Sequence, residues 1–592
     1  MKQRNEIPAE YKWKLSDIVE SDEKWESLLA ECENELPAVA ALKGTLGESA
    51  ESLFAAYEKV YAWYEKFEPV ADYAFLSKTL DGGDTKAQIM CDKMINLSVK
   101  ASSALAFLSP ELMSIPEEKL AEFMKYEPLA KYAHIIEDST RQRAHILDEK
   151  SEGILAMVGK ITQTPSDTYN MFTDVEMELP EVEDAEGKKH ELTSGTFGVM
   201  RESSDRVLRE NAFTKMFGTY GKYINTFACM YGGSVKQDNM FASLRGYKSA
   251  REASLSGSNV PESVYDALIE AVHAAIPSMS KYLKLRKKAL GLEKLDMFDL
   301  YTPMVADVEY PMPYENACEL VLHATAPLGE DYVNVIKRAY RENWIDVYET
   351  PGKESGAFSA GVYGVHPYVK LNYTDALDDA FTLAHELGHA MHSYLSSEKR
   401  DYANHEYHLL VAEVASTCNE VLLTKYLLKT ETDKRRRAYI LNHFLEGFRT
   451  TVFRQTLFAE FEHKAHELEA AGTSINADCL SKVYEELVKL YYPDAEFRDV
   501  IKYEWAYIPH FYRAYYVYQY ATGFSSAVAI ASNILETGDA SHYLEFLSSG
   551  GSDYPLNELK LAGIDLTSPK VVENAMKLFD ETIDELDAVL SE

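Results

Sequence analysis

The stretch TDALDDAFTLAHELGHAMHSYL, residues 374–395, decides how this chain is interpreted. From Leu377 onward its apolar residues recur with the period of an α-helix. Thr374 and Asp375 are residue types that favour a helix N-cap and first turn. The pattern therefore predicts a helix that begins near Ala376 and contains the rest of the stretch.

Two histidines in this helix have metal-ligand spacing. His385 and His389 are four residues apart, so both imidazoles would lie on one helical face and reach one ion. Glu386 would lie beside that ion, where a carboxylate can take a proton from a metal-activated water. The pattern predicts a zinc peptidase site, and the alternative is a pair of surface histidines. Gly388 costs about 1 kcal/mol relative to Ala inside a helix, which allows a close approach of substrate or of another helix, or has no role.

A third ligand is expected because catalytic zinc usually has three protein ligands. A second helix, predicted over Leu409–Leu428, is mostly apolar and carries two carboxylates, Glu413 and Glu420. A carboxylate among apolar neighbours is costly unless it is paired or bound to metal. The short connection Glu398–His408 would return this helix antiparallel to the first. We therefore predict Glu413 as the third ligand.

Three further residues have open roles. Glu420 lies two turns beyond Glu413 on the same face, where it would orient a ligand imidazole or form an ordinary salt bridge. Asp378 lies two turns before His385 and has the same two interpretations. His392 faces roughly the same side as His385, and it would line the site as a hydrogen-bonding residue, have a structural role, or be a further ligand.

Several blocks of sequence, taken in order, resemble the oligoendopeptidase F family within the thimet-oligopeptidase group of zinc peptidases. They extend from one end of the chain to the other, so the resemblance covers the whole protein. The blocks are EYKWKLSDI (Glu10–Ile18), GAFSAGVYGVHPYVKLNYT (Gly356–Thr374), TLAHELGHAMHSY (Thr382–Tyr394), AEVAST (Ala412–Thr417), WAYIPHFYRAYYVYQYATG (Trp505–Gly523) and SSGGSDYPLNELKLAGIDL (Ser548–Leu566).

The resemblance implies one Zn²⁺ per chain on His385, His389 and Glu413, with Glu386 as the catalytic base. It also implies a mainly α, elongated multi-helix body of zincin type, with a small β element near the active site. A deep channel in that body would admit short unstructured peptides and exclude folded proteins.

The segment from His510 to Tyr520 is rich in hydrogen-bond donors that could stabilise the oxyanion of peptide hydrolysis. Read as a helix, it places Tyr515 and Tyr518 on one face with Tyr512. Aromatic stripes at helical spacing are more often core. The resemblance implies a catalytic role for donors from this segment, so Tyr515, Tyr518 and His510 are candidates.

A strand is predicted over Tyr368–Asn372, directly before the metal helix. It would pair with the substrate backbone, or it would be part of a simple edge hairpin. A second hairpin is predicted within Val175–Thr193, turning at Glu186-Gly187. We place the domain boundary just after it, with an N-terminal helical region over 1–195 and a catalytic domain over 196–592.

Composition and charge limit the classes of partner that the protein is expected to bind. The formal net charge of −35 argues against nucleic-acid binding, which requires a basic surface. The 6 cysteines are widely scattered and are expected to be reduced thiols. No run of 18 apolar residues occurs, so no membrane partner is expected. These features predict a cytoplasmic enzyme whose oligomeric state the sequence does not reveal.

The predicted function is zinc-dependent endopeptidase activity on short oligopeptides. One alternative is a zinc exopeptidase, either a carboxypeptidase or a dipeptidyl carboxypeptidase, which needs a cation for the substrate carboxylate. Arg513, Lys370 and Arg400 are candidates for that cation. Another alternative is a non-catalytic peptide-binding protein with a structural metal, although structural zinc sites usually have four Cys or His ligands.

Overall fold

The computed structural model describes residues 2–305, 308 and 310–591. The chain is predominantly helical with small sheets, as the sequence predicts. Its contacts divide it into two compact units, each assembled from three separate segments. Unit 1 comprises 1–144, 311–423 and 530–563, and unit 2 comprises 145–310, 424–529 and 564–592. The units combine segments that are far apart in the chain, whereas the predicted domains, 1–195 and 196–592, are contiguous stretches. Those domains stay a prediction.

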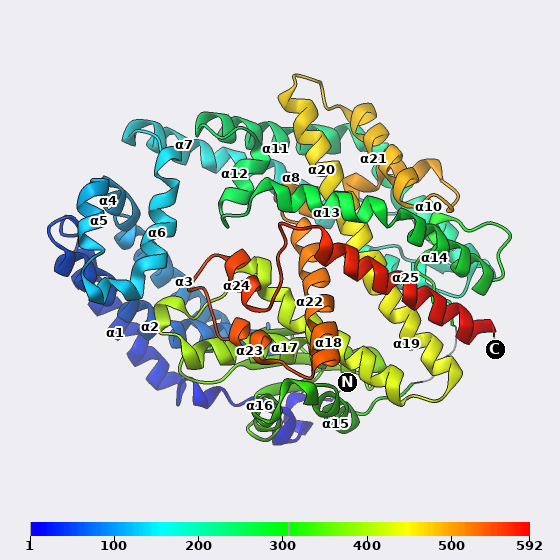
Figure 1. The fold of residues 1–592 in the computed structure, drawn as a ribbon, viewed down its shortest axis with the longest axis horizontal. Coiled ribbons are helices and arrows are strands. Elements are labelled where there is room, and N and C mark those ends of the chain that lie inside the picture. Colours follow the sequence, from blue (N-terminus) through cyan, green and yellow to red (C-terminus); the bar gives the residue numbers. More distant parts are fainter. Residues whose placement is uncertain (1, 306–307, 309, 592) are drawn as a thin grey trace. The chain divides into compact units, whose positions relative to one another are not determined.

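Unit 1 contains the N-terminal helices and the helix that carries the two histidines (Figure 1). Its helices are α1 (Asp22–Ala40), α2 (Ala50–Leu80), α3 (Thr85–Leu105), α4 (Leu108–Ser114), α5 (Glu117–Phe123), α6 (Ala133–Arg141), α15 (Tyr314–Ala324), α16 (Glu330–Arg341), α17 (Leu377–Lys399), α23 (Ser541–Leu547) and α24 (Pro555–Leu561).

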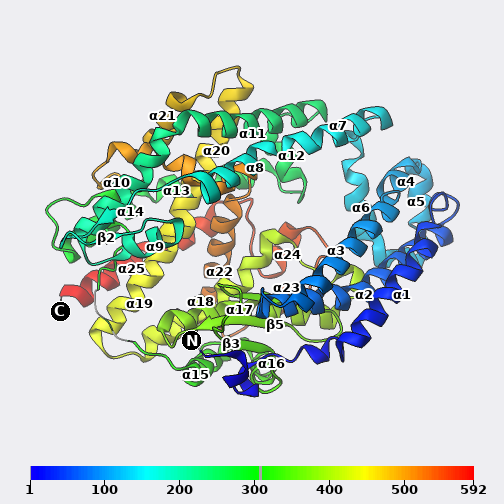
Figure 2. The same cartoon turned by 180° about the vertical axis from the view of Figure 1, so that it is seen from behind.

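Unit 2 contains most of the remaining helices (Figure 2). They are α7 (Glu149–Thr162), α8 (Thr164–Met171), α9 (Ser194–Glu202), α10 (Arg206–Lys222), α11 (Ile224–Leu244), α12 (Ala250–Ser256), α13 (Glu262–Ala274), α14 (Ile276–Ala289), α19 (Lys434–Gly447), α20 (Arg454–Ala470), α21 (Ala477–Tyr491) and α25 (Lys570–Ser591). Two further helices, α18 (Leu409–Thr430) and α22 (Tyr518–Thr537), contribute residues to both units.

Helices α1, α2 and α3 pack side by side around an aromatic core (Figures 1 and 2). Trp25 and Trp63 are fully buried there. Each indole N–H donates to a backbone carbonyl, Trp25 to Val70 at 2.8 Å and Trp63 to Cys32 at 3.0 Å. Both indoles are therefore buried without an unmet hydrogen bond, which is the condition for burying Trp at low cost.

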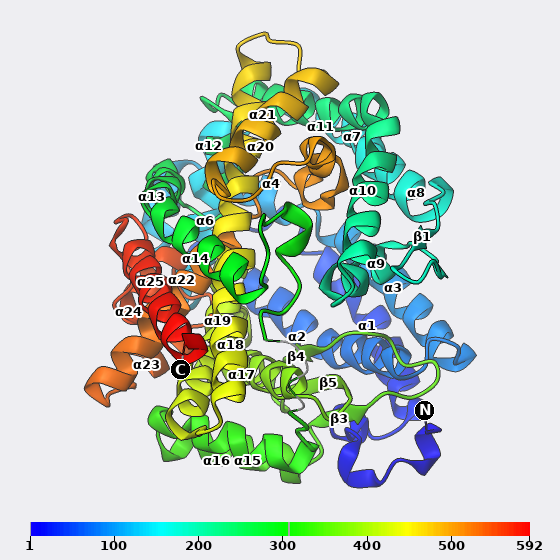
Figure 3. The same cartoon turned by 90° about the vertical axis from the view of Figure 1, so that its right-hand side faces the viewer.

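A three-stranded sheet leads into the metal helix (Figure 3). Its strands are β3 (Ile345–Tyr348), β4 (Phe358–Ala360) and β5 (Tyr368–Tyr373), in the order β3-β5-β4. Strand β5 runs parallel to β3 and antiparallel to β4, with Val369 opposite both Ile345 and Ser359. The prediction that Tyr368–Asn372 pairs with substrate is therefore wrong, because both edges of this strand already have partners.

Helix α17 begins at Leu377, one residue later than predicted, with Ala376 at the N-cap. The cap comes from Asp379 rather than from the predicted pair Thr374 and Asp375. One Asp379 carboxylate oxygen accepts the backbone N–H groups of Thr374 at 2.8 Å and Ala376 at 3.0 Å. An acidic side chain at this end also interacts favourably with the helix dipole.

Helices α17 and α18 run antiparallel with close backbone contact. The side-chain amide of Asn419 donates to the carbonyl of Ala384 at 3.1 Å. One turn further along α17, a Cβ added to Gly388 would lie 2.5 Å from the Cα of Ser416. Gly388 therefore allows the close approach of another helix, which is one of the three interpretations that the sequence left open.

The predicted hairpin differs in detail from the structure. The predicted hairpin forms, with β1 (Val182–Glu183) antiparallel to β2 (Lys189–His190) and Gly187 at φ 80° in its turn. Its strands are only two residues long, however, and the first residues of the predicted segment belong to a π-helical turn, Phe172–Glu176. Among the described residues, no helix is long and apolar enough to span a bilayer.

Candidate metal centre

Helix α17 and the part of α18 that belongs to unit 1 supply three side chains that converge on one point. His385 and His389 come from α17, and Glu413 comes from the second turn of α18. The two Nε2 atoms lie 3.2 Å apart. The nearer oxygen of Glu413, Oε2, lies 3.4 Å from Nε2 of His385 and 3.5 Å from Nε2 of His389. The structure thus brings together the three ligands that the sequence predicts.

The size of this triangle suits a tetrahedral metal ion. Zinc binds His nitrogen and carboxylate oxygen at about 2.0–2.2 Å. Two ligands of one tetrahedral ion at that distance are separated by about 3.3–3.6 Å. Two of the three atom pairs fall in this range and the third, at 3.2 Å, lies just below it, so the residues present fit a zinc ion. Their side chains are partly exposed, as an accessible catalytic site requires.

Glu420 orients one of the histidines. Its carboxylate lies 2.7 Å from Nδ1 of His385, on the ring nitrogen that faces away from the other ligands. A hydrogen bond donated from Nδ1–H leaves the lone pair of Nε2 free for a metal. The sequence left two interpretations of Glu420 open. The structure favours the one in which its carboxylate orients a ligand imidazole over an ordinary salt bridge.

Ser416 makes a similar contact that sequence reasoning missed. Its hydroxyl donates to Oε2 of Glu413 at 3.0 Å, from three residues further along α18. The i, i+3 spacing of a hydroxyl and a predicted ligand on one helix is the signal that could have identified it.

Glu386 lies beside the three ligands and is only 6% exposed. Its Oε2 atom is buried and has no hydrogen-bond partner among the described residues. Burial raises the pKa of Glu386, and the nearby imidazoles of His385 and His389 oppose that effect. A carboxylate with an unsatisfied oxygen and a raised pKa is suited to accept a proton and release it later.

The site carries an excess of negative groups. Burial opposes a charged imidazole, but Glu420, Glu386 and Glu413 raise the pKa of His385 to about 9. Burial likewise opposes ionisation of Glu413, but the two imidazoles lower its pKa to about 2. The three carboxylates thus favour a cation at the site. A metal that binds there would displace the extra proton of the His385 imidazolium.

Two residues with open roles lie outside the metal group. His392 is 0% exposed and stacks on Tyr407 with ring centroids 3.6 Å apart. Neither of its ring nitrogens has a hydrogen-bond partner within the described parts of the chain, and burial lowers its pKa to about 3. Its role is therefore packing rather than hydrogen bonding at the site. Asp378 lies in the first turn of α17 and is exposed.

The three predicted oxyanion donors belong to unit 2. Tyr515 lies in a turn at φ 55°, and Tyr518 is the first residue of α22, so the continuous helix assumed for this segment is wrong. Both tyrosines are 2% exposed, and the Tyr515 hydroxyl lies 3.3 Å from Nδ1 of His463. His510 is exposed. Their assignment as donors stays a prediction.

The three cations proposed for an exopeptidase have different environments. Lys370 is buried, and its ammonium donates to the carbonyl of Glu354 at 2.9 Å. This hydrogen bond holds the loop before β4. Arg400 donates to the carbonyl of Ser548 at 3.0 Å. Arg513 is exposed and stacks over the ring of Tyr516 at 4.2 Å. Nothing in these contacts favours carboxylate recognition.

A helix with a His-Glu-x-x-His motif, facing a carboxylate of an antiparallel helix, defines a site of the metal-dependent peptidase class. The chain belongs to peptidase family M3, whose family model matches residues 199–578. A second family model, described as oligopeptidase F, matches residues 111–178. The protein is therefore a metalloendopeptidase, as the sequence predicts.

Relatives match along nearly the whole chain. Oligopeptidase PepF of Bacillus subtilis is 42% identical over 99% of this chain and 88% of its own length. An oligoendopeptidase F homolog of Lactococcus lactis is 39% identical over 100% of this chain and 99% of its own length.

Solved structures agree with this assignment. A crystal structure of a putative peptidase from Chlamydophila abortus has a TM-score of 0.94 at 31% identity, and covers 99% of this chain and 100% of that one. Oligoendopeptidase-F from Enterococcus faecium has a TM-score of 0.75 at 37% identity, over 96% of this chain and 99% of that one.

Proposed function

We propose that the protein is a zinc-dependent endopeptidase that hydrolyses internal bonds of short unstructured oligopeptides. The observation that carries the proposal is the triangle of His385, His389 and Glu413, whose edges of 3.2–3.5 Å fit one tetrahedral zinc ion. The names of the relatives, oligopeptidase and oligoendopeptidase, support peptides as substrates. A cytoplasmic location stays a prediction from the sequence.

A zinc ion at this site would supply Lewis-acid polarisation of the substrate carbonyl and would acidify the attacking water. The chain's own residues do the rest. His385 and His389 hold their Nε2 lone pairs toward the site, and Glu420 keeps the Nδ1 proton of His385 in place. Glu413, bonded to the Ser416 hydroxyl, completes the set with a negative charge.

Glu386 is the proposed proton carrier. Its unpartnered Oε2 takes the proton from the attacking water as the bond to the scissile carbon forms. Because burial raises its pKa, the protonated carboxyl persists long enough to give the proton to the leaving amine nitrogen. One carboxyl group therefore acts first as base and then as acid.

Strand β4 is the proposed contact for the substrate main chain. It pairs with β5 on one side and packs against α17. Within the described part of the sheet its other edge has no partner strand. Pairing with backbone groups there would recognise peptides with little dependence on sequence, which suits an oligopeptidase.

The proposal is tested with an internally quenched peptide of about ten residues, blocked at both ends. We expect cleavage at an internal bond, loss of cleavage with a chelator, and recovery with added zinc. Cleavage that requires a free C-terminus would instead indicate the exopeptidase. Absence of cleavage of both peptides would contradict peptidase function.

The role of Glu386 has its own test. Glu386→Gln keeps the size of the side chain and removes the base, so turnover should fall by about 10²–10⁴-fold while zinc content is unchanged. Glu398→Gln, an exposed change near the far end of α17, is the matched control and should keep full activity. Turnover of Glu386→Gln near that of the control would remove Glu386 from the mechanism.

A further inference from the structure

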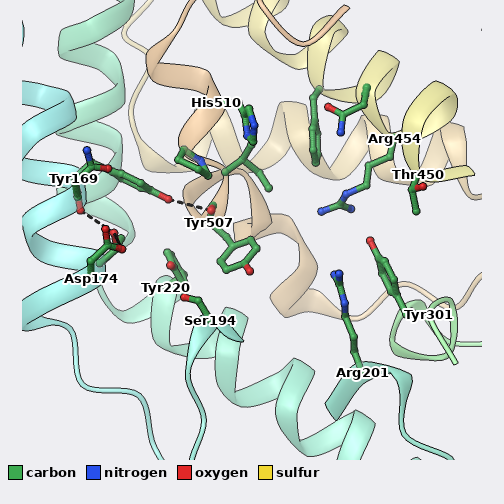
Figure 4. Close-up of a pocket in the computed structure, with 16 residues that line it drawn as sticks. Tyr169, Asp174, Ser194, Arg201, Tyr220, Tyr301, Thr450, Arg454, Tyr507 and His510 are labelled. Carbon is green, nitrogen blue, oxygen red and sulfur yellow. Dashed lines mark hydrogen bonds between the residues drawn. The ribbon is translucent and has the colours of Figure 1, made fainter. Parts of the chain in front are cut away.

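Unit 2 contains a cavity of about 590 Å³ whose lining includes His510 but none of the three proposed metal ligands. Its walls come from α8, α9, α10 and α20 and from two 3-10 segments, Asp499–Tyr507 and Pro509–Tyr512 (Figure 4). A volume of this size is typical of pockets that bind small molecules or one to two amino-acid residues.

Three hydrogen-bond donors gather at one end of this cavity. Arg201 of α9 and Arg454, the first residue of α20, lie on either side of the hydroxyl of Tyr301. Figure 4 shows both guanidinium groups and this hydroxyl directed toward the same space. Asp174, the acidic residue of the lining, appears at the opposite side of the view.

These donors have unused hydrogen-bonding capacity. The Tyr301 hydroxyl and Nε of Arg201 are buried, and neither has a hydrogen-bond partner among the described residues. Arg201 forms no ion pair with any acid that the structure describes, whereas Nη2 of Arg454 pairs with Glu504 at 2.7 Å. Burying such groups without a partner is costly, which suggests that an acceptor from a ligand completes them.

The donors are also held rigidly. The Tyr301 ring lies between two guanidinium groups, Arg201 at 3.8 Å and Arg449 at 4.3 Å from the ring centroid. Arg449 is itself fixed by an ion pair with Glu446. Donors that need no rearrangement on binding lose little entropy, so each bond to a ligand contributes more.

The electrostatic field at this end is positive. Burial favours a raised pKa for Tyr301, but Arg454, Arg449 and Arg201 together lower it below its ordinary value. Glu504 pairs with Arg454, and Glu446 is shared by Arg449 and Arg286, so the two acids leave this cluster positive, and Arg201 has no acidic partner among the described residues. A carboxylate can accept hydrogen bonds from the planar guanidinium of Arg201 and from the Tyr301 hydroxyl together, which suits the placement of these donors.

The remaining walls suit an amino-acid side chain. Tyr220 and Tyr507 lie beside the charged end (Figure 4), and Phe458 also lines the cavity. The hydroxyl of Tyr169 donates to the carbonyl of Tyr507 at 3.0 Å, which fixes this aromatic wall. Apolar walls next to a few convergent donors are the usual composition of a specific ligand pocket.

We propose that this cavity binds the free C-terminal carboxylate of a peptide, with Arg201, Arg454 and Tyr301 as donors and the last side chain against the aromatic wall. The choice of a peptide, rather than another monocarboxylate, rests on the proposed oligopeptidase function. The cavity would favour peptides with a free C-terminus over the same peptides with an amidated one.

The test is calorimetric titration of the zinc-loaded enzyme with two ligands, acetyl-Ala-Phe and acetyl-Ala-Phe-amide, with mass spectrometry to show that both remain intact. We expect the acid to bind at least about tenfold more tightly than the amide, since hydrogen bonds to a charged group are the stronger ones. Arg201→Gln and Tyr301→Phe should each abolish most of that preference. Lys248→Gln removes one exposed positive charge elsewhere in unit 2 and should keep it.

Tyr301→Phe separates a loss of binding from a loss of folding. It keeps the ring that Arg201 and Arg449 contact and removes only the hydroxyl. Equal affinity for acid and amide in the wild-type enzyme, or a preference that survives both variants, would overturn the proposal. Inorganic phosphate is titrated as well, and binding of phosphate but not of the acid also overturns it. Because these readouts need no turnover, failure here is distinguishable from failure of the peptidase function.

Discussion

Glu420 controls the orientation of His385 through one hydrogen bond of 2.7 Å. Glu420→Gln removes the negative charge behind the ring, so zinc affinity should weaken by about 10–100-fold. Glu413→Gln should weaken it further, because a direct anionic ligand becomes a neutral amide. Competition with a chromogenic chelator measures both constants. An unchanged zinc affinity in Glu420→Gln would show that His385 needs no such partner.

The buried carboxyl group of Glu558 leads to a prediction of how the free energy of unfolding depends on pH. Glu558 of α24 is 1% exposed, and burial raises its pKa to about 8 from the ordinary 4.5. Between these two values the unfolded chain is ionised while the folded chain keeps the proton. The folded state therefore binds more protons, and its stability falls as pH rises through that window.

Glu558→Gln should remove this dependence. Each pKa unit corresponds to about 1.4 kcal/mol, so the penalty relieved at pH 8 is roughly 2–4 kcal/mol after allowance for residual solvation. The unfolding temperature of the variant relative to wild type should rise from pH 5 to pH 8 in scanning calorimetry. Glu545→Gln, an exposed change on α23, is the control. A parallel pH profile for variant and wild type would contradict the assignment.

At the residue scale, sequence patterns anticipated which three side chains lie together at the candidate metal centre. The i, i+4 histidines and the rare acids of an apolar helix are local signals, so they identify His385, His389 and Glu413 without coordinates. The unpartnered oxygen of Glu386 and the Ser416 contact depend on side-chain placement, which no spacing rule supplies.

Helices α17 and α18 carry the ligand set, and Gly388 sets their separation. Gly388→Ala would place a Cβ 2.5 Å from Cα of Ser416 and 2.6 Å from the carbonyl oxygen of Ala415. The helices must then separate, at a cost of about 1–3 kcal/mol, although Ala is the better helix former. We expect a lower unfolding temperature together with weaker zinc binding, measured by calorimetry and chelator competition.

Gly153→Ala is the matched control. Gly153 also lies inside a helix, α7, but a Cβ there meets nothing within 4 Å. It should be neutral or stabilising by up to about 1 kcal/mol. If both substitutions behaved alike, helix propensity and not the contact with α18 would explain Gly388.

At the scale of elements, helices were easier to predict than the segments between them. The apolar period of α17 located it to within one residue at its start. The period could not show that β5 is a central strand, since pairing with β3 joins residues far apart in sequence. It also failed at Tyr515, where a positive φ breaks the helix that the tyrosine spacing suggested.

For the whole molecule, all three proposed metal ligands belong to unit 1. A ligand stabilises only the parts whose folded state it binds, by about 2.7 kcal/mol at a concentration 100 times its Kd. We therefore expect zinc to slow hydrogen exchange in α17 and in the first half of α18, with little change in α10 and α13 of unit 2. Mass spectrometry with and without chelator measures this. Equal protection of both units would contradict it.

The segmented units have a consequence for synthesis. Unit 1 needs residues 1–144 and also 530–563, where Gly551 donates its backbone N–H to the carbonyl of Asn404 at 3.0 Å. On a ribosome that adds about 5–20 residues per second, the first segment waits roughly 20–80 s for the last one. Unit 1 thus cannot form all of its contacts until residues 530–563 have been synthesised. Until then the apolar surfaces that this segment covers are available to chaperones.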